Sequence, residues 1–233
     1  GLYDVRTAAE GHRWIVMEFV AGERLSDVLA RHPHGLPQDE ALAWLRGLAA
    51  GVEYLHQNGI VHRDLKPANL FREHGVVKIG DYGLSKFITA SRRSGHTESV
   101  GTVHYMAPEI AGGRYGKEID VYSLGIILYE MLTGRVPFDG ESVGEILMKH
   151  LSSEPDLSML AEPYRGAIAA ALQKDPARRP ATVGELLRMV DGGVDSAASR
   201  PPVATQAPPA VVRSEPATTL AHVRRSFSFS QVP

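Results

Sequence analysis

The sequence predicts an α+β fold in which a short β region precedes a largely helical body. Residues 12–20 (HRWIVMEFV) are rich in β-branched and aromatic side chains and lead to Ala21-Gly22, which is typical of a strand. Residues 2–6 offer this strand a hairpin partner. From Leu25 onward, apolar residues recur at helical spacing, so the rest of the ordered chain is expected to be mainly α-helical.

The predicted helices follow one another along the chain. The first long one ends before a glycine, and a second covers residues 121–132. Two later ones begin at Ser142-x-x-Glu145 and Thr182-x-x-Glu185, which have the form of a capping box. The stripe that the first long helix is expected to bury consists of Leu42, Leu45, Leu48, Ala49, Val52 and Leu55.

Composition excludes several classes of function. With 25 basic and 27 acidic residues, the net charge of −2 creates no field that would favour nucleic acid or a membrane surface, so small molecules and proteins are the expected partners. The chain has no cysteine, which excludes disulfides, thiolate metal sites and Cys nucleophiles and fits a reducing cytosol. No His pair has the H-E-x-x-H spacing of a zinc site.

Neither a membrane span nor a signal peptide is predicted. The most apolar stretch, residues 121–132, is interrupted by Ser123 and Glu130 and is shorter than the roughly 20 residues that a bilayer requires. From residue 191 the composition changes to Pro, Ala, Ser, Val and Arg without a helical period, which predicts a disordered tail over residues 191–233. Because the chain starts at Gly1 without an initiator Met, its ends need not be those of the natural protein.

Residues 62–69 (HRDLKPAN) match in full the pattern H-R-D-x-x-x-x-N of a kinase catalytic loop. On this motif the chain resembles the protein kinase superfamily, and in particular the bacterial, eukaryotic-like Ser/Thr kinases. The resemblance implies that Asp64 accepts the proton of the incoming hydroxyl group. It further implies that Lys66 neutralises charge on the transferring phosphoryl group and that Asn69 holds Mg²⁺ through its amide oxygen.

A second motif supplies the other metal ligand. Residues 77–83 (VKIGDYG) end in Asp-Tyr-Gly where the family usually has Asp-Phe-Gly. The resemblance implies that Asp81 chelates Mg²⁺ between the phosphates of ATP. Tyr82 replaces the Phe whose ring packs beneath the Asp, a role that a Tyr ring can fill if its hydroxyl finds a partner.

Residues 101–109 (GTVHYMAPE) are similar to the end of a kinase activation segment. In the family, the Thr of this segment lines the substrate site near the catalytic Asp, so Thr102 together with Lys66 implies Ser or Thr rather than Tyr as the acceptor. The family pairs Glu109 with an Arg of a late helix loop, and Arg179 is the expected partner. Asp120 matches the Asp that braces the catalytic loop, and it is also a candidate N-cap.

The nucleotide site is assigned by order along the chain relative to the catalytic loop. The resemblance implies that residues 15–20 lead into the hinge, with Met17 as gatekeeper, that the backbone of Glu18 and Val20 faces adenine, and that Phe71 lies under the purine. Taken alone, these four would be ordinary strand and core residues. The expected cofactors are ATP and Mg²⁺.

Hydroxyl groups in the loop between Asp81 and Glu109 predict control by phosphorylation. A phosphate there would pair with Arg63 and order the loop, and Thr97 and Ser99 are the first candidates, ahead of Ser91 and Ser94. Incidental hydroxyls in a polar loop are the alternative. Residues 224–228 (RRSFS) look like a site for a kinase that prefers basic substrates, although such short runs also arise by chance.

The expected organisation is a remnant of the N-lobe β-sheet in residues 1–20, a mainly helical kinase C-lobe in residues 21–190, and the tail. No upstream Gly-rich loop, strand Lys or helix Glu is found, since the only glycines before the hinge are Gly1 and Gly11. We therefore expect a cytoplasmic Ser/Thr protein kinase that is inactive as this fragment, with membrane attachment through absent regions left open. The alternatives are a non-catalytic interaction module and, less favoured, a phosphotransferase acting on small molecules.

Overall fold

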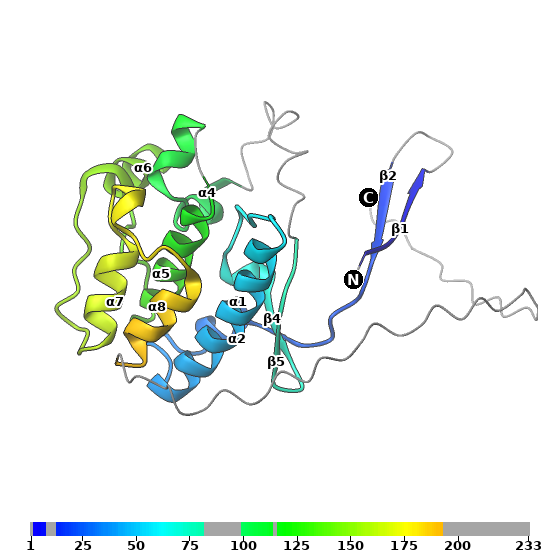
Figure 1. The fold of residues 1–233 in the computed structure, drawn as a ribbon, viewed down its shortest axis with the longest axis horizontal. Helices are drawn as coiled ribbons and strands as arrows, with labels where there is room; N and C mark the ends of the chain where they lie inside the picture. Colours follow the sequence, from blue (N-terminus) through cyan, green and yellow to red (C-terminus); the bar gives the residue numbers. More distant parts are fainter. Residues whose placement is uncertain (1, 8–12, 82–98, 114–115, 193–233) are drawn as a thin grey trace, which may run out of the picture. The chain divides into compact units, whose positions relative to one another are not determined.

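The computed structural model describes residues 2–7, 13–81, 99–113 and 116–192 (Figure 1). The chain divides into two compact units, Gly1–Val194 and Asp195–Pro233, and every described residue belongs to the first. The predicted tail therefore lies outside the described residues from residue 193 onward, and so do Tyr82 and Thr97. The described part combines antiparallel sheets with a helical body, which confirms the α+β fold.

The first strand pair is the predicted hairpin. β1 (Leu2–Thr7) runs antiparallel to β2 (Arg13–Met17), with Leu2 opposite Met17. β2 is shorter than the predicted strand over residues 12–20, because residues 18–20 extend past the first paired residue of β1 and no described strand lies opposite them. A strand without a partner leaves its backbone groups without ladder hydrogen bonds, so the chain leaves the extended ladder at this point.

A second sheet supports the catalytic loop and has the strand order β3-β4-β5. β3 (Glu23–Arg24) pairs with β4 (Leu70–Glu73), which pairs with β5 (Val76–Ile79). The two-residue turn between β4 and β5 consists of His74 and Gly75 at φ values of 50° and 79°. Positive φ at both positions gives the backbone twist that a tight hairpin requires, and Gly adopts it without strain.

The helical body is built around α5 (Glu118–Thr133), whose side chains are buried on nearly all sides. A helix that is apolar all round belongs in the interior of a fold. α2 (Gln38–Gln57) packs against α5, as does α7 (Tyr164–Ala171) (Figure 1). The other described α-helices are α1 (Leu25–Ala30), α4 (Ser99–Val103), α6 (Val143–Ser152) and α8 (Val183–Val190).

α2 buries the predicted stripe and carries the second sheet. Five of its six stripe positions are buried, whereas Leu42 is only partly so. Gly47 and Gly51 of this helix face β5, where an added Cβ would overlap the side chains of Val77 and Ile79 respectively. The two glycines thus allow a close approach of helix and strand, and they fix β5 next to the catalytic loop that precedes β4.

Both predicted capping residues begin their helices. The Ser142 side chain accepts a hydrogen bond from the backbone N of Glu145 at 3.2 Å, and Thr182 accepts from Glu185 N at 3.0 Å. The prediction for α5 was wrong at its start, because the helix begins at Glu118. Asp120 is therefore no N-cap but a first-turn residue. Within the described ranges, no helix is both long and apolar enough to span a membrane.

Candidate active site

The catalytic loop is held from beneath by a buried carboxylate. Asp120 of α5 is fully buried and accepts hydrogen bonds from the backbone N of His62 at 2.8 Å and of Arg63 at 3.0 Å. The Nε2 atom of His56 lies 2.8 Å from the same carboxylate. A buried charge requires such partners, and these fix the start of the loop, where Arg63 adopts a left-handed φ of 72°. The predicted brace is confirmed.

Asp64, Lys66 and Thr102 form a connected polar cluster. The Lys66 ammonium lies 2.9 Å from an oxygen of the Asp64 carboxylate, and it donates a hydrogen bond of 2.9 Å to the Thr102 hydroxyl. Thr102 belongs to α4 (Ser99–Val103), 36 residues further along the chain than Lys66. The predicted proximity of Thr102 to Asp64 is thus achieved through Lys66, which contacts both side chains.

Asn69 ties the loop to the position of Asp81. Asn69 ends the short 3₁₀ helix η1 (Pro67–Asn69), and its Nδ2 atom donates to the backbone O of Asp64 at 2.9 Å and to its carboxylate at 3.2 Å. The backbone N of Gly80 donates to Asn69 O at 2.8 Å, and His62 Nε2 lies 2.9 Å from Gly80 O. Asp81 therefore follows directly on a residue that is fixed to the loop at two points.

The side-chain oxygens of Asn69 and Asp81 are ligands that suit a hard cation. No described residue donates a hydrogen bond to Oδ1 of Asn69. The side chain of Asp81 is exposed, and its backbone has a φ of 57°, in a region that non-glycine residues rarely occupy. Mg²⁺ takes oxygen ligands and retains several waters or phosphate oxygens, so an amide oxygen and one carboxylate are an adequate protein contribution.

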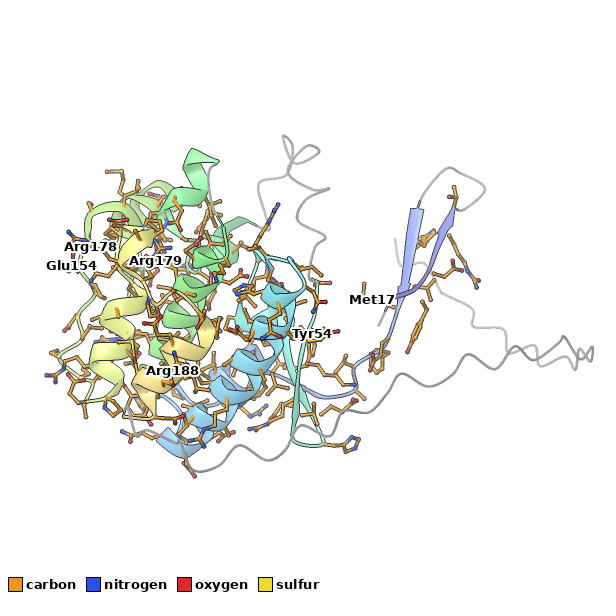
Figure 2. All side chains as sticks on the ribbon, viewed as in Figure 1. Met17, Tyr54, Glu154, Arg178, Arg179 and Arg188 are labelled. Carbon is orange, nitrogen blue, oxygen red and sulfur yellow. The ribbon has the colours of Figure 1, made fainter. Side chains whose placement is uncertain are left out.

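The predicted hinge residues are brought together only in part. Met17 lies in β2 (Figure 2), and Val20 lies in the connection that leads to β3. Glu18 contacts β5, where the Lys78 ammonium is 2.6 Å from its carboxylate. This hydrogen bond, above all, lowers the pKa of Glu18 to about 2. Because Lys78 is paired with Phe71 in the β4-β5 register, Glu18 is tied to the strand that carries the predicted purine floor.

The segment that ends in Ala-Pro-Glu is fastened by a buried ion pair. Glu109 lies in η2 (Pro108–Gly112), and its two carboxylate oxygens accept from Arg179 Nη1 at 2.5 Å and Nη2 at 2.8 Å. The Arg179 side chain is fully buried and also donates from Nε to Gln173 O at 2.8 Å. Its guanidinium stacks over the Tyr122 ring. The predicted pair of Glu109 with Arg179 is confirmed.

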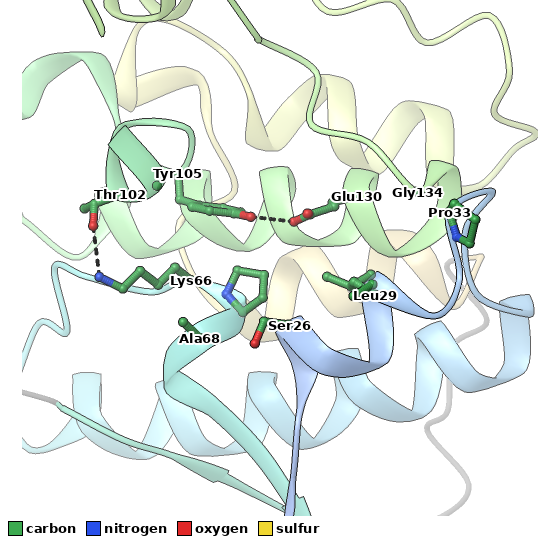
Figure 3. A pocket seen from close by; sticks show the side chains of 12 residues that line it. Ser26, Leu29, Pro33, Lys66, Ala68, Thr102, Tyr105, Glu130 and Gly134 are labelled. Carbon is green, nitrogen blue, oxygen red and sulfur yellow. Dashed lines mark hydrogen bonds between the residues drawn. The ribbon is translucent and has the colours of Figure 1, made fainter. Parts of the chain in front are cut away.

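A cavity of about 590 Å³ opens beside the polar cluster (Figure 3). Lys66 and Thr102 line one side of it, and Tyr105 and Glu130 line another. The Tyr105 hydroxyl donates to a Glu130 oxygen at 2.7 Å. Lys66, which contacts Asp64, thus connects that carboxylate to the lining of the cavity.

Sequence reasoning missed four parts of this site. The sequence singled out Glu130 only as a charge that interrupts an apolar run and Tyr105 only as a member of the GTVHYMAPE segment, and it gave no signal for His56. The bond between His62 and Gly80 was also not anticipated. A single acid within the apolar run 121–132 was the usable signal, since such a residue is seldom buried without a specific partner.

Comparison with known proteins gives a consistent picture. The family model described as Protein kinase domain matches residues 2–189. The chain is 40% identical over 196 residues to the serine/threonine-protein kinase drp72 of Corynebacterium efficiens, and this match covers 81% of the chain and 38% of that protein. It is 39% identical over 181 residues to PrkC of Bacillus subtilis, covering 74% of the chain and 28% of PrkC.

A third relative, PknA of Corynebacterium glutamicum, is 40% identical over 188 residues, which cover 76% of the chain and 39% of PknA. PrkC and PknA both bear the name serine/threonine-protein kinase. The chain thus spans less than two fifths of the length of each of these three relatives.

Proposed function

The chain belongs to the protein kinase family, and from this we propose that the protein containing it transfers the γ-phosphoryl group of ATP to Ser and Thr hydroxyls of proteins. The observation that carries this proposal is the bridge formed by Lys66 between Asp64 and Thr102. It joins the candidate base to the segment against which an acceptor would lie. The names of the relatives, all serine/threonine-protein kinases, support the choice of acceptor.

Each residue of the cluster has a chemical role in this proposal. Asp64 orients the acceptor hydroxyl and takes its proton, while Lys66 offsets negative charge as the phosphoryl group moves in line. Asn69 and Asp81 would hold Mg²⁺, which would supply positive charge beside the phosphates of ATP. The hydrogen bonds from Asn69 to Asp64 keep the base and the metal ligand in one fixed arrangement.

The nucleotide is proposed to lie between the hinge and the second sheet. The backbone of Glu18 and Val20 would face adenine, Met17 would stand at the entrance to the pocket behind it, and Phe71 would support the purine. The contact of Lys78 with Glu18 favours this arrangement, since it holds the hinge against the strand pair that contains Phe71. Residues outside the present chain would supply the remaining contacts to the phosphates.

A non-catalytic interaction module is the second candidate. It is favoured by exposed apolar side chains in the first 20 residues, of which Phe19 is 87% exposed and Trp14 63% exposed. Several exposed apolar side chains on one segment are typical of a surface that another segment or protein covers. Catalytic activity of the longest protein encoded by the reading frame discriminates between the two candidates.

Lys66→Met in that longest protein is expected to lower the rate of phosphoryl transfer to a Ser/Thr peptide by about 10²-fold, because one preorganised charge is removed from the transition state. The readout is peptide phosphorylation by mass spectrometry, which also separates Ser and Thr from Tyr. Lys117→Met, an exposed lysine before α5, is the matched control and should retain full activity. Equal activity of both variants would contradict the role of Lys66.

A further inference from the structure

His150 is a buried imidazole that has no role in the candidate active site. It lies in the last turn of α6, and only 1% of its surface is exposed. Its Nδ1 atom lies 2.8 Å from the Tyr122 hydroxyl of α5. Its Nε2 atom is also buried, and no described residue forms a hydrogen bond with it. One nitrogen of the ring thus connects α6 to the central helix, while the other is enclosed without a partner.

An aromatic ring and a cation pack beside the imidazole. The Phe138 ring lies edge to face with the His150 ring, with 4.8 Å between their centres. The ammonium of Lys174 lies 4.3 Å from the centre of the same Phe138 ring, and among the described residues it has no hydrogen-bond acceptor. A positive charge therefore lies close to a ring that could itself become positive.

These surroundings oppose a proton on the imidazole. Burial, above all, lowers the pKa of His150 to about 4, and the charges of Lys174 and His104 act in the same direction. The backbone of His104 has the opposite effect, which is the smallest of the four. A charged ring would also have two N–H donors, whereas Tyr122 can accept from only one of them.

The other titratable groups nearby do not offer the ring a counter-charge. Burial raises the pKa of Tyr122, so its hydroxyl stays neutral. Burial lowers the pKa of Lys174, and the negative charge of Glu154, in the connection after α6, opposes this shift. Asp139 is paired with His104, whose Nε2 lies 3.2 Å from its carboxylate. In the part of the chain that the structure describes, no carboxylate forms an ion pair with His150.

The contact between His150 and Tyr122 lies next to the fastener of the segment that ends in Ala-Pro-Glu. The Arg179 guanidinium lies 4.8 Å from the centre of the Tyr122 ring, and it binds both oxygens of Glu109. α6 packs against α4 and η2, which both belong to this segment. A change in the packing of α6 would therefore be felt by the segment as well.

We propose that His150 is a pH-sensitive switch, in which the neutral ring holds α6 against α5 and acidification below neutral pH favours release of this helix. The inference concerns a conformational change and goes beyond the proposed function. Because the docked ring has the lower pKa, the stability that its neutral form contributes is fully present above about pH 6.5. That stability declines as the pH falls toward 4.

The two pKa values set the size of the expected effect. With a pKa of about 4 for the docked ring and 6.5 for the released one, the equilibrium constant for release of α6 should rise about 30-fold between pH 7.5 and pH 5.0. Local opening of a helix is measured by hydrogen exchange of its backbone amides. The amides of α2, which has no contact with His150 among the described residues, provide an internal reference.

The test uses the longest protein encoded by the reading frame, as wild type, as His150→Asn and as His34→Asn. Asn places a polar atom near the position of Nδ1 and cannot be protonated in this pH range. His34 is exposed and lies in the connection between α1 and α2, so its replacement controls for the loss of one imidazole. Melting curves verify the fold of each variant.

We expect the protection factors of α6 in the wild type and in His34→Asn to fall about 30-fold more than those of α2 between pH 7.5 and pH 5.0. In His150→Asn, the protection of both helices should change in parallel. The absence of this extra fall in the wild type, or its persistence in His150→Asn, would overturn the inference.

A second measurement requires no variant. Nuclear magnetic resonance of the wild type with ¹³C-labelled histidine gives the protonation midpoint of the His150 ring. The ring should remain neutral down to pH 5, and a midpoint at pH 6 or above would refute the switch even if His150→Asn failed to fold. Neither measurement depends on phosphoryl transfer, so a failure of the proposed function and a failure of this inference are distinguishable.

Discussion

Asp64→Asn in the longest protein encoded by the reading frame is expected to lower kcat for Ser/Thr phosphorylation by about 10²- to 10⁴-fold, the range over which general bases contribute. The change leaves the size of the side chain unchanged and removes its capacity to take a proton. It also replaces the acceptor of the Lys66 ammonium by a neutral amide. A steady-state assay with a Ser peptide, ATP and Mg²⁺ measures the loss.

A control variant and melting curves distinguish a loss of catalysis from a loss of folding. Asp39→Asn, at an exposed position in the first turn of α2, removes a similar charge far from the cluster in sequence and should leave kcat unchanged. Both variants should melt close to the wild type, because the Asp64 side chain is partly exposed and Asn at this position keeps an oxygen that can accept from Lys66 and Asn69. Full activity of Asp64→Asn would remove Asp64 as the base.

Arg179→Ala is expected to destabilise the helical body by about 3–5 kcal/mol, the usual cost when one partner of a buried ion pair is removed. The substitution leaves the Glu109 carboxylate without its two guanidinium donors and frees the backbone oxygens of Gln173, Lys174 and Glu118. Urea unfolding monitored by circular dichroism gives the free energy of unfolding.

The neighbouring residue provides the matched control. Arg178 lies next to Arg179 in the sequence (Figure 2), but its side chain is 75% exposed, and its nearest acid, Asp175, is 3.9 Å away. Arg178→Ala should therefore change the free energy of unfolding by less than about 1 kcal/mol. If both substitutions lowered the free energy of unfolding by the same small amount, the ion pair of Arg179 with Glu109 would not stabilise the helical body as expected.

Features governed by local rules were predictable from the sequence. The stripe of α2 follows from helical periodicity, and the caps at Ser142 and Thr182 follow from the spacing of a hydroxyl and an acid. The resemblance to kinases also gave the partners of Glu109 and the role of Asp120, each of which bridges some 60 to 70 positions along the chain.

Features that depend on tertiary context were not predictable. The length of β2 is set by the register of β1, and the start of α5 by the turn before it rather than by the capping propensity of Asp120. The contact of His56 with Asp120 joins residues 64 positions apart, and no local sequence pattern predicts it. The position of Glu130 in the cavity and its hydrogen bond with Tyr105 depend on how α5 packs, so the sequence alone could not predict them.

Some predictions remain predictions. Thr97, Ser91 and Ser94 lie outside the described residues, and Ser99 begins α4 without a described side chain. The roles of Met17, Val20 and Phe71 in holding adenine also stay proposals, as do the metal ligands Asn69 and Asp81. What the described residues provide is a rigid framework, in which α5 fixes the loop from beneath and α2 fixes the second sheet beside it.

We propose that this framework positions a Mg²⁺-dependent phosphoryl transfer to Ser and Thr. The most direct measurement is transfer from γ-labelled ATP to a general protein substrate, with the longest encoded protein and the present chain compared in Mg²⁺ and in EDTA. We expect labelled phosphoserine and phosphothreonine from the longest protein in Mg²⁺ only. Absence of transfer from both proteins in Mg²⁺ would contradict it and favour the interaction module.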